Sequence, residues 1–545
     1  MMIDVRSLPP DEALKTQICI VGGGPAGLTI ARELANQNFQ VHLLESGGIE
    51  FDPETQSLSE GIVVGDPYPV VHETRRRQLG GTSHSWEGQS GYQQYGWRCL
   101  PLDPIDFEQR DWVPYSGWPF TRADLDPFYR RAQKVCQIEP SAYAVEDWQD
   151  ERAKPLAFKS DRLTTGISQY GLRDPFTTEY PNTLRQASNI TMLLHANVVE
   201  IETDEPGQRV TRLRIATLEG KQYWLEATLF IMATGGMENA RLLLASNRQQ
   251  SAGLGNQHDV VGRYFMDRPI LSCGLIPYSQ KVFDQTNLYD IYPTKHGPVM
   301  AHIKLSETTM RQEQLMNNGA QLFPRPLPHQ REATLALREL LTAMRHGKLP
   351  QDLAKCLKVI GQGSSYVASA SFWSAIRRIP AFHRGDWSYL PSEKRRFSQF
   401  EIFYQLEQAP DPNNRIVLNA ERDRLGLPKT EIRWRLNDID IQNAIRIQEI
   451  WAEEFNQAGI GQLQFTRNWA EQTFEKTAMH HHIGSTRMHH DPKQGVVDAN
   501  CKVHSLTNLF ITGCSVFPTA GYSNPTLTMI ALSLRLADHV KTLMT

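Results

Sequence analysis

Short apolar runs alternate with helical patterns in the first part of the chain. Residues 18–21 form one apolar run, a glycine-rich turn follows, and apolar positions then recur at helical spacing over 28–35. A second apolar run covers 41–44 and ends in Glu45. Short runs bounded by glycine are typical of buried strands, whereas spacings of three and four residues are typical of helices. The pattern therefore predicts a strand, a turn, a helix and a second strand.

Alternating apolar and polar positions return between residues 190 and 225 and predict several further strands. Another buried run over 227–232 leads into two glycines and a helix over 238–245. A strand that ends in glycines before a helix can return the chain to the same parallel sheet. We therefore expect the first domain to be built from distant pieces of the chain.

The segment 271–475 carries no such glycine pattern. Residues from about 305 to 395 are polar, basic and helical in pattern, and 400–406 alternate as a strand. A lid, an oligomer contact and a docking surface for an electron acceptor are three interpretations of the helical part, and solvated insertion helices are a fourth. Before this segment, Thr121 is the predicted N-cap of a helix over 125–137.

Composition narrows the class of protein. A chain of 545 residues is long enough for two domains, and a net charge of −3 gives no electrostatic reason for binding nucleic acid. Seven scattered cysteines, never in CxxC spacing, argue against a disulfide framework, a zinc site or a c-type haem. No run approaches the ~18 apolar residues of a membrane span, and the first residues lack a secretory signal pattern. We therefore expect a cytoplasmic protein without an intrinsic membrane span.

Three glycines in the first turn have the spacing of a dinucleotide-binding motif. Gly22 allows a tight turn, Gly24 lets the backbone approach a pyrophosphate, and Gly27 lets the helix pack on the strand. Glu45, at the end of the second strand, is placed to receive ribose hydroxyls, which disfavours NADP. The motif predicts a dinucleotide site but does not by itself separate FAD from NAD.

A basic run at 75–77 leads into a stretch of small residues and one tryptophan: Gly80, Gly81, Thr82, Ser83 and Trp86. Paired glycines followed by hydroxyls suit a backbone that passes close to a flat or phosphorylated ligand. A surface turn beside a solvated arginine cluster is the alternative, since charge runs usually mark a solvated face.

Three adjacent histidines at 480–482 precede Asn524 in the last part of the chain. A histidine can change its protonation near neutral pH, and an amide can orient an oxygen, so these residues predict a pair that handles an alcohol oxygen. A histidine-rich metal site that includes His489 and His490 is the alternative. Because no carboxylate or cysteine lies at ligand spacing, we expect no metal site.

Four stretches together resemble the glucose-methanol-choline (GMC) family of FAD-dependent oxidoreductases, and the resemblance runs nearly from end to end. They are the glycine turn with Glu45; the small residues at 80–83 with Trp86; residues 233–236; and His481-x-x-Gly484-Ser485-x-Arg487-Met488 with 524–528. The stretch at 80–86 is similar to the branch that contains pyranose oxidase and bacterial sugar dehydrogenases.

The resemblance implies an α/β plus α+β architecture. A Rossmann-like FAD-binding domain would be built from the discontinuous segments 1–270 and 476–545, with parts of 90–190 contributing to the substrate side. A substrate-binding domain of antiparallel sheet and helices would cover 271–475 and include the helical insertion at about 305–395.

The resemblance also implies roles for individual residues. His481 would accept the substrate hydroxyl proton while hydride leaves to flavin N5, and Asn524 would bind the same oxygen. The apolar helix expected over 526–540, with Pro525 at its first turn, would point its positive end at the flavin. The implied cofactor-binding residues are Gly22, Gly24, Gly27, Glu45, Gly80, Gly81, Thr82, Ser83, Trp86, Val198, Ala233, Thr234, Gly235, Gly513, Cys514, Pro525 and Thr526.

Some relatives attach the flavin through a histidine immediately before the tryptophan. Here Ser85 holds that position and His84 is one residue out of register, so we expect a dissociable FAD. The expected activity is dehydrogenation of an alcohol or hemiacetal hydroxyl of a sugar, sugar derivative or polyol. A separate acceptor protein or a quinone would take the electrons. A peroxide-producing oxidase, a non-sugar alcohol as substrate, and a homo-oligomer stay open as alternatives.

Overall fold

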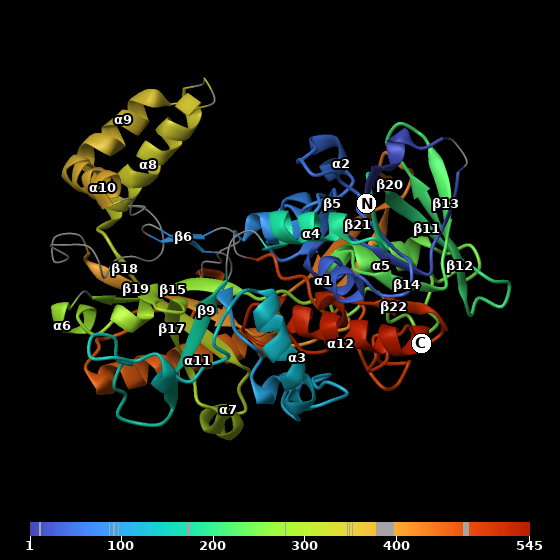
Figure 1. The fold of residues 1–545 in the computed structure, drawn as a ribbon. Helices are drawn as coiled ribbons and strands as arrows, with labels where there is room; N and C mark the ends of the chain where they lie inside the picture. The colour runs from blue at the N-terminus through green and yellow to red at the C-terminus, as the bar shows by residue number, and fades with distance from the viewer. Residues whose placement is uncertain are drawn as a thin grey trace.

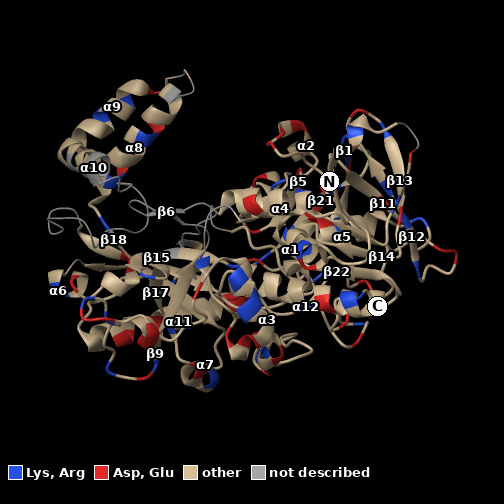
Figure 2. Cartoon of the chain, in the orientation of Figure 1, with Lys and Arg blue, Asp and Glu red and all other residues tan. Residues whose placement is uncertain are grey.

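The computed structural model describes residues 1–9, 12–86, 88–90, 93–95, 98–171, 175–277, 279–345, 347, 349–350, 352–377, 397–471 and 479–545. Two lobes pack side by side, and both ends of the chain lie in the same lobe (Figure 1). Acidic and basic residues are interspersed over both lobes rather than separated onto opposite sides (Figure 2). Every helix within the described ranges is too short or too polar to cross a bilayer.

A six-stranded parallel sheet forms the centre of the lobe that holds the chain ends. Its order is β1 (Met2–Asp4), β10 (Ile190–Leu194), β4 (Val41–Leu44), β3 (Ile18–Val21), β14 (Leu229–Met232) and β22 (Leu509–Ile511). All residues of β3 and β14 are buried, which explains their continuous apolar runs. The predicted return of a distant strand to this sheet is confirmed by β14.

Helices cover the faces of the parallel sheet. The predicted strand, turn, helix and strand are confirmed as β3, α1 (Pro25–Leu34) and β4. The C-terminal helix α12 (Thr526–Met544) packs against α1 and α3 (Arg122–Val135). Thr121 caps α3 in a reciprocal box with Asp124, as predicted. Helices α2 (Pro53–Ser57), α4 (Tyr180–Gln186) and α5 (Gly235–Ala245) also belong to this lobe (Figure 1).

Two smaller sheets flank the parallel one. The first contains β11 (Asn197–Thr203), β12 (Val210–Ala216), β13 (Gln222–Glu226) and β2 (Ala13–Lys15). The second contains β20 (Arg415–Arg422), β21 (Pro428–Trp434) and β5 (Gly61–Gly65). Ile416, Ile432 and Trp434 are buried in the same apolar core as the parallel sheet. This part of the segment 271–475 therefore packs with the first lobe, contrary to the predicted domain boundary.

The second lobe is built on an antiparallel sheet with its own apolar core. The sheet order is β15 (Ile270–Pro277), β19 (Gln399–Leu406), β18 (Asn318–Arg325), β17 (Gly297–Leu305), β9 (Leu163–Tyr170) and β8 (Arg98–Cys99), with β16 (Tyr292–Thr294) paired to β17. The long helix α11 (Asp438–Ala458) contributes Ile447, Ile450 and Trp451 to the core. Strands β8 and β9, which come from the segment 90–190, lie at one end of this sheet.

Residues 305–395 do not form one helical insertion. Helix α7 (Glu307–Glu313) is followed by β18, an interior strand of the sheet. Its sequence begins Asn-Gly and contains a proline, features that normally argue against an interior strand, and pairing with β17 and β19 overrides them. Beyond it, α8 (Pro328–Arg345), α9 (Leu353–Gln362) and α10 (Ser364–Arg377) pack on one another and project from the second lobe (Figure 1).

Candidate functional site

A cavity of about 530 Å³ lies where the two lobes meet. Most of its wall comes from the lobe of the parallel sheet, and the second lobe contributes Arg98, Tyr170 and Arg268. The carboxyl ends of β3, β4, β14 and β22 lead into residues that line it, because the ends of parallel strands meet at one edge of a sheet.

The first glycine turn forms one end of the cavity wall. Gly22 has φ +111°, and a Cβ there would lie 2.5 Å from the Ala233 carbonyl oxygen. A Cβ at Gly27 would lie 1.9 Å from the Gly22 carbonyl oxygen, so α1 packs directly on the turn and Gly27 stays behind the wall. Gly24 lines the cavity, and a Cβ there would approach only the Gly81 Cα, at 3.9 Å. The turn and the start of α1 thus leave room for a phosphate group.

Glu45 is fixed at the wall by backbone groups. Its Oε2 accepts a hydrogen bond from Gly23 N at 2.8 Å, and its Oε1 accepts one from Gly47 N at 2.8 Å. Burial raises the pKa of this carboxyl, and the two N–H groups oppose that effect. The acid therefore lies beside the glycine turn, where the sequence predicts the ribose.

The second glycine loop lies against the first. Gly80 N donates to the Gly23 carbonyl at 2.8 Å, and Gly81 packs against Gly24. Gly80 and Ser83 do not line the cavity; the Ser83 hydroxyl donates to the Gly80 carbonyl and closes the turn. The residues of this loop that face the cavity are Gly81, Thr82, Ser85 and Trp86.

His84 is turned away from the cavity wall formed by this loop. Its Nε2 lies 2.8 Å from the Leu79 carbonyl oxygen, whereas Ser85 faces the cavity. Ser85, and not His84, therefore faces the cavity at this loop.

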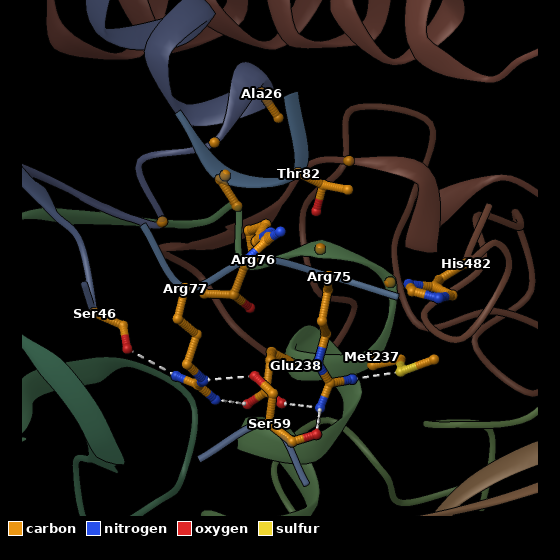
Figure 3. Close-up of a pocket in the computed structure, with 18 of the residues that line it drawn as sticks. Ala26, Ser46, Ser59, Arg75, Arg76, Arg77, Thr82, Met237, Glu238 and His482 are labelled. Atoms are coloured by element: carbon orange, nitrogen blue, oxygen red, sulfur yellow. Dashed lines mark hydrogen bonds and ion pairs between the residues drawn. The ribbon is translucent and has the colours of Figure 1, made fainter. Parts of the chain in front are cut away.

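The basic run at 75–77 is mostly built into the wall. Arg75 Nη2 lies 2.8 Å from Glu238 Oε1, and Arg77 Nη2 lies 2.9 Å from Glu238 Oε2 (Figure 3). Burial alone would raise the pKa of Glu238, but Arg77, Arg241 and Arg75 together lower it to about 2. Only Arg76 of the run is exposed. The interpretation of this run as a solvated cluster is therefore wrong for Arg75 and Arg77.

The remaining predicted cofactor residues also face the cavity. Gly235 and Gly513 have positive φ, and a Cβ on either would meet no atom within 4 Å, so both present bare backbone to open space. The others that line the wall are Val198, Ala233, Thr234, Cys514, Pro525 and Thr526. Burial raises the pKa of the Cys514 thiol to about 12, so this side chain is neutral.

His481 lies in the cavity wall with an unpaired ring nitrogen. Its backbone N–H donates to Asp267 Oδ1, and its Nδ1 lies 3.8 Å from the same oxygen without a hydrogen bond. Burial lowers the pKa of His481 well below its usual range, and the positive charge of Arg268 lowers it further. The lowered pKa therefore favours the unprotonated imidazole near neutral pH.

The two neighbouring histidines also contribute to the wall. The His482 ring stacks on Phe265 with centroids 6.1 Å apart, and burial lowers its pKa well below the usual range. All three adjacent histidines therefore line the same cavity. Among the residues that the structure describes, no group of three or more histidine, cysteine, aspartate or glutamate side chains is placed to hold a metal ion.

Asn524 precedes α12 and is held by two arginines that sequence analysis missed. Its Oδ1 accepts from Arg268 Nη1 at 2.8 Å and from Arg98 Nη2 at 3.2 Å. Neither arginine belongs to a motif or a charge run, and their common partners lie hundreds of residues away, so no local signal reveals them.

These residues fit a flavin dinucleotide. The start of α1 and Gly24 offer N–H groups and space for phosphates, Glu45 stands beside them for a ribose, and bare backbone at Gly235 and Gly513 leaves room for a flat ring. The N-terminus of α12 lies at the same wall as Asn524, where it can favour negative charge on a ring.

Curated relatives and solved structures resemble this chain over nearly its whole length. The fructose dehydrogenase large subunit of Gluconobacter japonicus is 21% identical, over 97% of this chain and 98% of its own. The paromamine 6'-oxidase of Streptomyces fradiae is 29% identical, over 97% of this chain and 92% of its own. A formate oxidase structure has a TM-score of 0.54 at 18% identity and covers 97% of this chain and 99% of its own, which shows a shared fold.

Two family models match the sequence itself. Residues 17–344 match the model described as FAD dependent oxidoreductase, and residues 410–533 match the model described as GMC oxidoreductase. The first match covers both glycine loops and Glu45, and the second covers His481 and Asn524. The chain therefore belongs to the GMC oxidoreductase family of FAD-dependent enzymes.

Proposed function

We propose that this protein oxidises an alcohol or hemiacetal hydroxyl of a sugar, sugar derivative or polyol. The observation that carries the proposal is His481, a half-buried imidazole with a lowered pKa that lines the same cavity as Asn524 and the start of α12. The names of a fructose dehydrogenase and a paromamine oxidase among the relatives support a carbohydrate-type substrate.

The cofactor is held without a covalent bond in this proposal. When bound, FAD supplies the hydride acceptor of the reaction. Gly24 and the start of α1 would bind the phosphates of FAD, and Glu45 would bind its ribose. Gly81 and Thr82 would cover the part of the cofactor next to the phosphates. Ser85 at the cavity wall and the engagement of His84 with the Leu79 carbonyl support a dissociable cofactor.

His481 is the general base in this proposal. Because its pKa is lowered, the imidazole is unprotonated when substrate arrives and can accept the hydroxyl proton as hydride leaves the same carbon. Asp267 Oδ1 lies 3.8 Å from Nδ1, so a carboxyl group stands beside the ring that becomes positive. Asp267 thus acts as a positioning residue.

Asn524 orients the hydroxyl. Both arginine hydrogen bonds fall on its Oδ1, so its amide hydrogens point away from them and are available to the substrate oxygen. A fixed amide beside a base holds the alcohol in one reactive orientation, an effect that contributes several powers of ten to the rate.

The test is anaerobic flavin reduction by His481→Ala holoenzyme. We expect the reduction rate to fall by roughly 10²–10⁴-fold while the visible spectrum still reports bound FAD. His482→Ala is the matched control, because its ring also lines the cavity but stacks on Phe265, and we expect it to keep most of the rate. Reduction of the His481→Ala flavin at the wild-type rate would rule out His481 as the base.

The identity of the electron acceptor distinguishes a dehydrogenase from an oxidase. We favour a dehydrogenase that delivers electrons to a protein or quinone in the cytoplasm, where buried thiols such as Cys19 and Cys136 stay reduced. The paromamine 6'-oxidase favours the oxidase alternative. Mixing anaerobically reduced enzyme with air decides between them, since rapid reoxidation with peroxide release identifies an oxidase.

A further inference from the structure

Two buried arginines face the substrate side of the cavity without an acidic partner. Arg98 on β8 is 7% exposed, and Arg268, just before β15, is 4% exposed. Within the described part of the chain, no carboxylate oxygen lies within 4.0 Å of either guanidinium. Arg110 and Arg241, which are buried to a similar degree, each bind a carboxylate, on Glu407 and Asp423 respectively.

The groups that the two guanidinium ions contact are neutral carbonyls. Both donate to Gln405 Oε1 and to Asn524 Oδ1, and Arg268 also donates to the Tyr522 carbonyl at 2.9 Å. Arg268 Nε is buried and has no hydrogen-bond partner. Burial lowers the pKa of Arg268 well below its usual range, and repulsion by Arg98 adds to that effect. Positive charge is therefore concentrated here and only partly compensated.

The other charged groups nearby are already engaged. Asp267, the acid next to Arg268, accepts hydrogen bonds from the Tyr68 hydroxyl and from His481 N. Lys304 forms an ion pair with Asp103 at 2.6 Å. If Asp267 is counted against the two arginines, one positive charge is left over at the cavity wall.

We propose that Arg98 and Arg268 bind a carboxylate of the substrate, so that the enzyme oxidises a hydroxy acid such as a sugar acid. The inference rests on the proposed function, because it names the substrate class of the same site. Two guanidinium ions can hold both oxygens of one carboxylate, and the single surplus charge matches a monoanion.

The geometry also fixes where the carboxylate stands relative to the reacting hydroxyl. Both guanidinium ions touch the oxygen of Asn524, the amide that would orient that hydroxyl, at 2.8 and 3.2 Å. A carboxylate on the arginines therefore lies only one or two carbons from the carbon that loses hydride. Hydride still leaves to the flavin and the hydroxyl proton still passes to His481.

The test is calorimetric titration of holoenzyme that has been reduced anaerobically with dithionite beforehand, so that a bound acid cannot pass hydride to the flavin. The probes are glycolate with its neutral counterpart glycolamide, and D-gluconate with D-glucitol. We expect each acid to bind at least about tenfold more tightly than its neutral partner, which corresponds to ~1.4 kcal/mol. The affinity of Arg268→Gln for each acid should be lower than that of the wild type by roughly 30-fold or more, because the substitution removes one guanidinium from the buried pair that would hold the carboxylate.

A second variant keeps both arginines and changes only the charge between them. Gln405→Glu is nearly isosteric and places a carboxylate where both guanidinium ions already donate. It should fold, bind FAD and bind glycolamide as before, yet lose the preference for glycolate. Arg487→Gln is the matched control, since Arg487 is 2% exposed, donates to the Tyr115 carbonyl and lies outside the cavity wall, and it should keep the preference.

Two results overturn the carboxylate site. One is equal affinity of wild-type enzyme for acids and their neutral partners, and the other is binding of inorganic phosphate without binding of either acid. Flavin reduction by neutral alditols with no preference for acids would leave the proposed function standing and remove the carboxylate site. Tight binding of acids without flavin reduction by any alcohol would support the carboxylate site and contradict the proposed function.

Discussion

At the scale of single residues, burial decides which groups in the cavity are charged. Desolvation and the nearby charge of Arg268 lower the pKa of the half-buried His481. Arg98 and Arg268 are buried beside carbonyl oxygens, and this burial lowers the pKa of both side chains. His481 and Asn524 were predictable from the sequence, because both belong to recognisable motifs. Arg98 and Arg268 were not predictable from the sequence, because an isolated arginine is usually a surface residue and only the folded chain brings these two together.

The lowered pKa of His481 predicts an unusual pH dependence. Only the unprotonated imidazole accepts a proton, so activity is lost as pH falls through its folded pKa, which lies below the usual histidine value of about 6.5. The rate of anaerobic flavin reduction should therefore stay level from about pH 8 down past pH 6.5. Arg268→Gln removes one cause of the shift and should move the acid limb to higher pH. An acid limb centred at about 6.5 in the wild type would contradict this prediction.

At the scale of elements, the turn between β3 and α1 contains one glycine that we expect FAD binding to require and another that the packing of the helix requires. Gly24 has φ −80°, which alanine adopts, and a Cβ there has room in the protein but projects where a phosphate would lie. Gly24→Ala should therefore fold normally and lose about tenfold or more in FAD affinity, measured by flavin fluorescence. Normal FAD affinity in this variant would show that the phosphates lie elsewhere.

Gly27→Ala is the contrasting variant in the same turn. Its Cβ would lie 1.9 Å from the Gly22 carbonyl oxygen, so α1 must move away from β3. We expect loss of stability in this variant even without cofactor, which denaturant unfolding of the apoprotein would detect.

Glu238 on α5 joins Arg75 and Arg77 of the second glycine loop through a buried ion-pair network. Glu238→Gln should destabilise the fold by about 3–5 kcal/mol at neutral pH, because it leaves buried positive charge unpaired. Since its pKa falls from 4.5 to about 2 on folding, the contribution is complete above pH 4.5 and is lost as pH falls towards 2. Urea unfolding should therefore show the difference from wild type narrowing over that interval.

A difference that stays constant down to pH 2 would contradict this assignment to Glu238. Glu431→Gln is the control, because Glu431 pairs with the exposed Arg433 on the surface of β21. We expect that substitution to change stability by less than about 1 kcal/mol.

The local sequence pattern predicted the type of an element correctly wherever residues that are neighbours in sequence are also neighbours in space. The strand, helix and strand around the first glycine turn were predictable for that reason. β18 was not, because its glycine and proline argue against a strand and its stability comes from β17 and β19. The placement of β20 and β21 beside β5 depends likewise on pairing across hundreds of residues.

At the scale of the whole molecule, α8 to α10 form a module that the main sheet does not require. Arg325 at the end of β18 pairs with Gln399 at the start of β19, and Ser398 N donates to the Arg325 carbonyl at 2.8 Å. Replacing residues 327–396 by a short glycine-containing turn, which keeps Phe397 stacked on Phe283, should therefore join β18 and β19 as a hairpin. We expect the shortened protein to bind FAD and to be reduced by substrate at a rate within a few-fold of wild type.

Loss of FAD from the shortened protein would show that the module supports the cavity. If the module serves electron delivery, reduction by substrate would persist while transfer to the natural acceptor falls. Leu335, Leu341 and Leu357 are about half exposed on its helices, so their replacement by glutamate in the full-length chain gives an independent measurement of the same role.

The parallel sheet joins β3 to β22, which are nearly 500 residues apart along the chain, and this order matters during protein synthesis. At ~5–20 residues per second, a ribosome needs roughly 25–100 s to travel from one strand to the other. β14 is made about 280 residues before β22, so for the later half of that interval it has an open apolar edge, which exposes the nascent chain to chaperones and proteases. Because Gly513, Cys514 and Pro525 line the cavity, we expect a chain terminated upstream of residues 509–511 to be unable to keep its flavin.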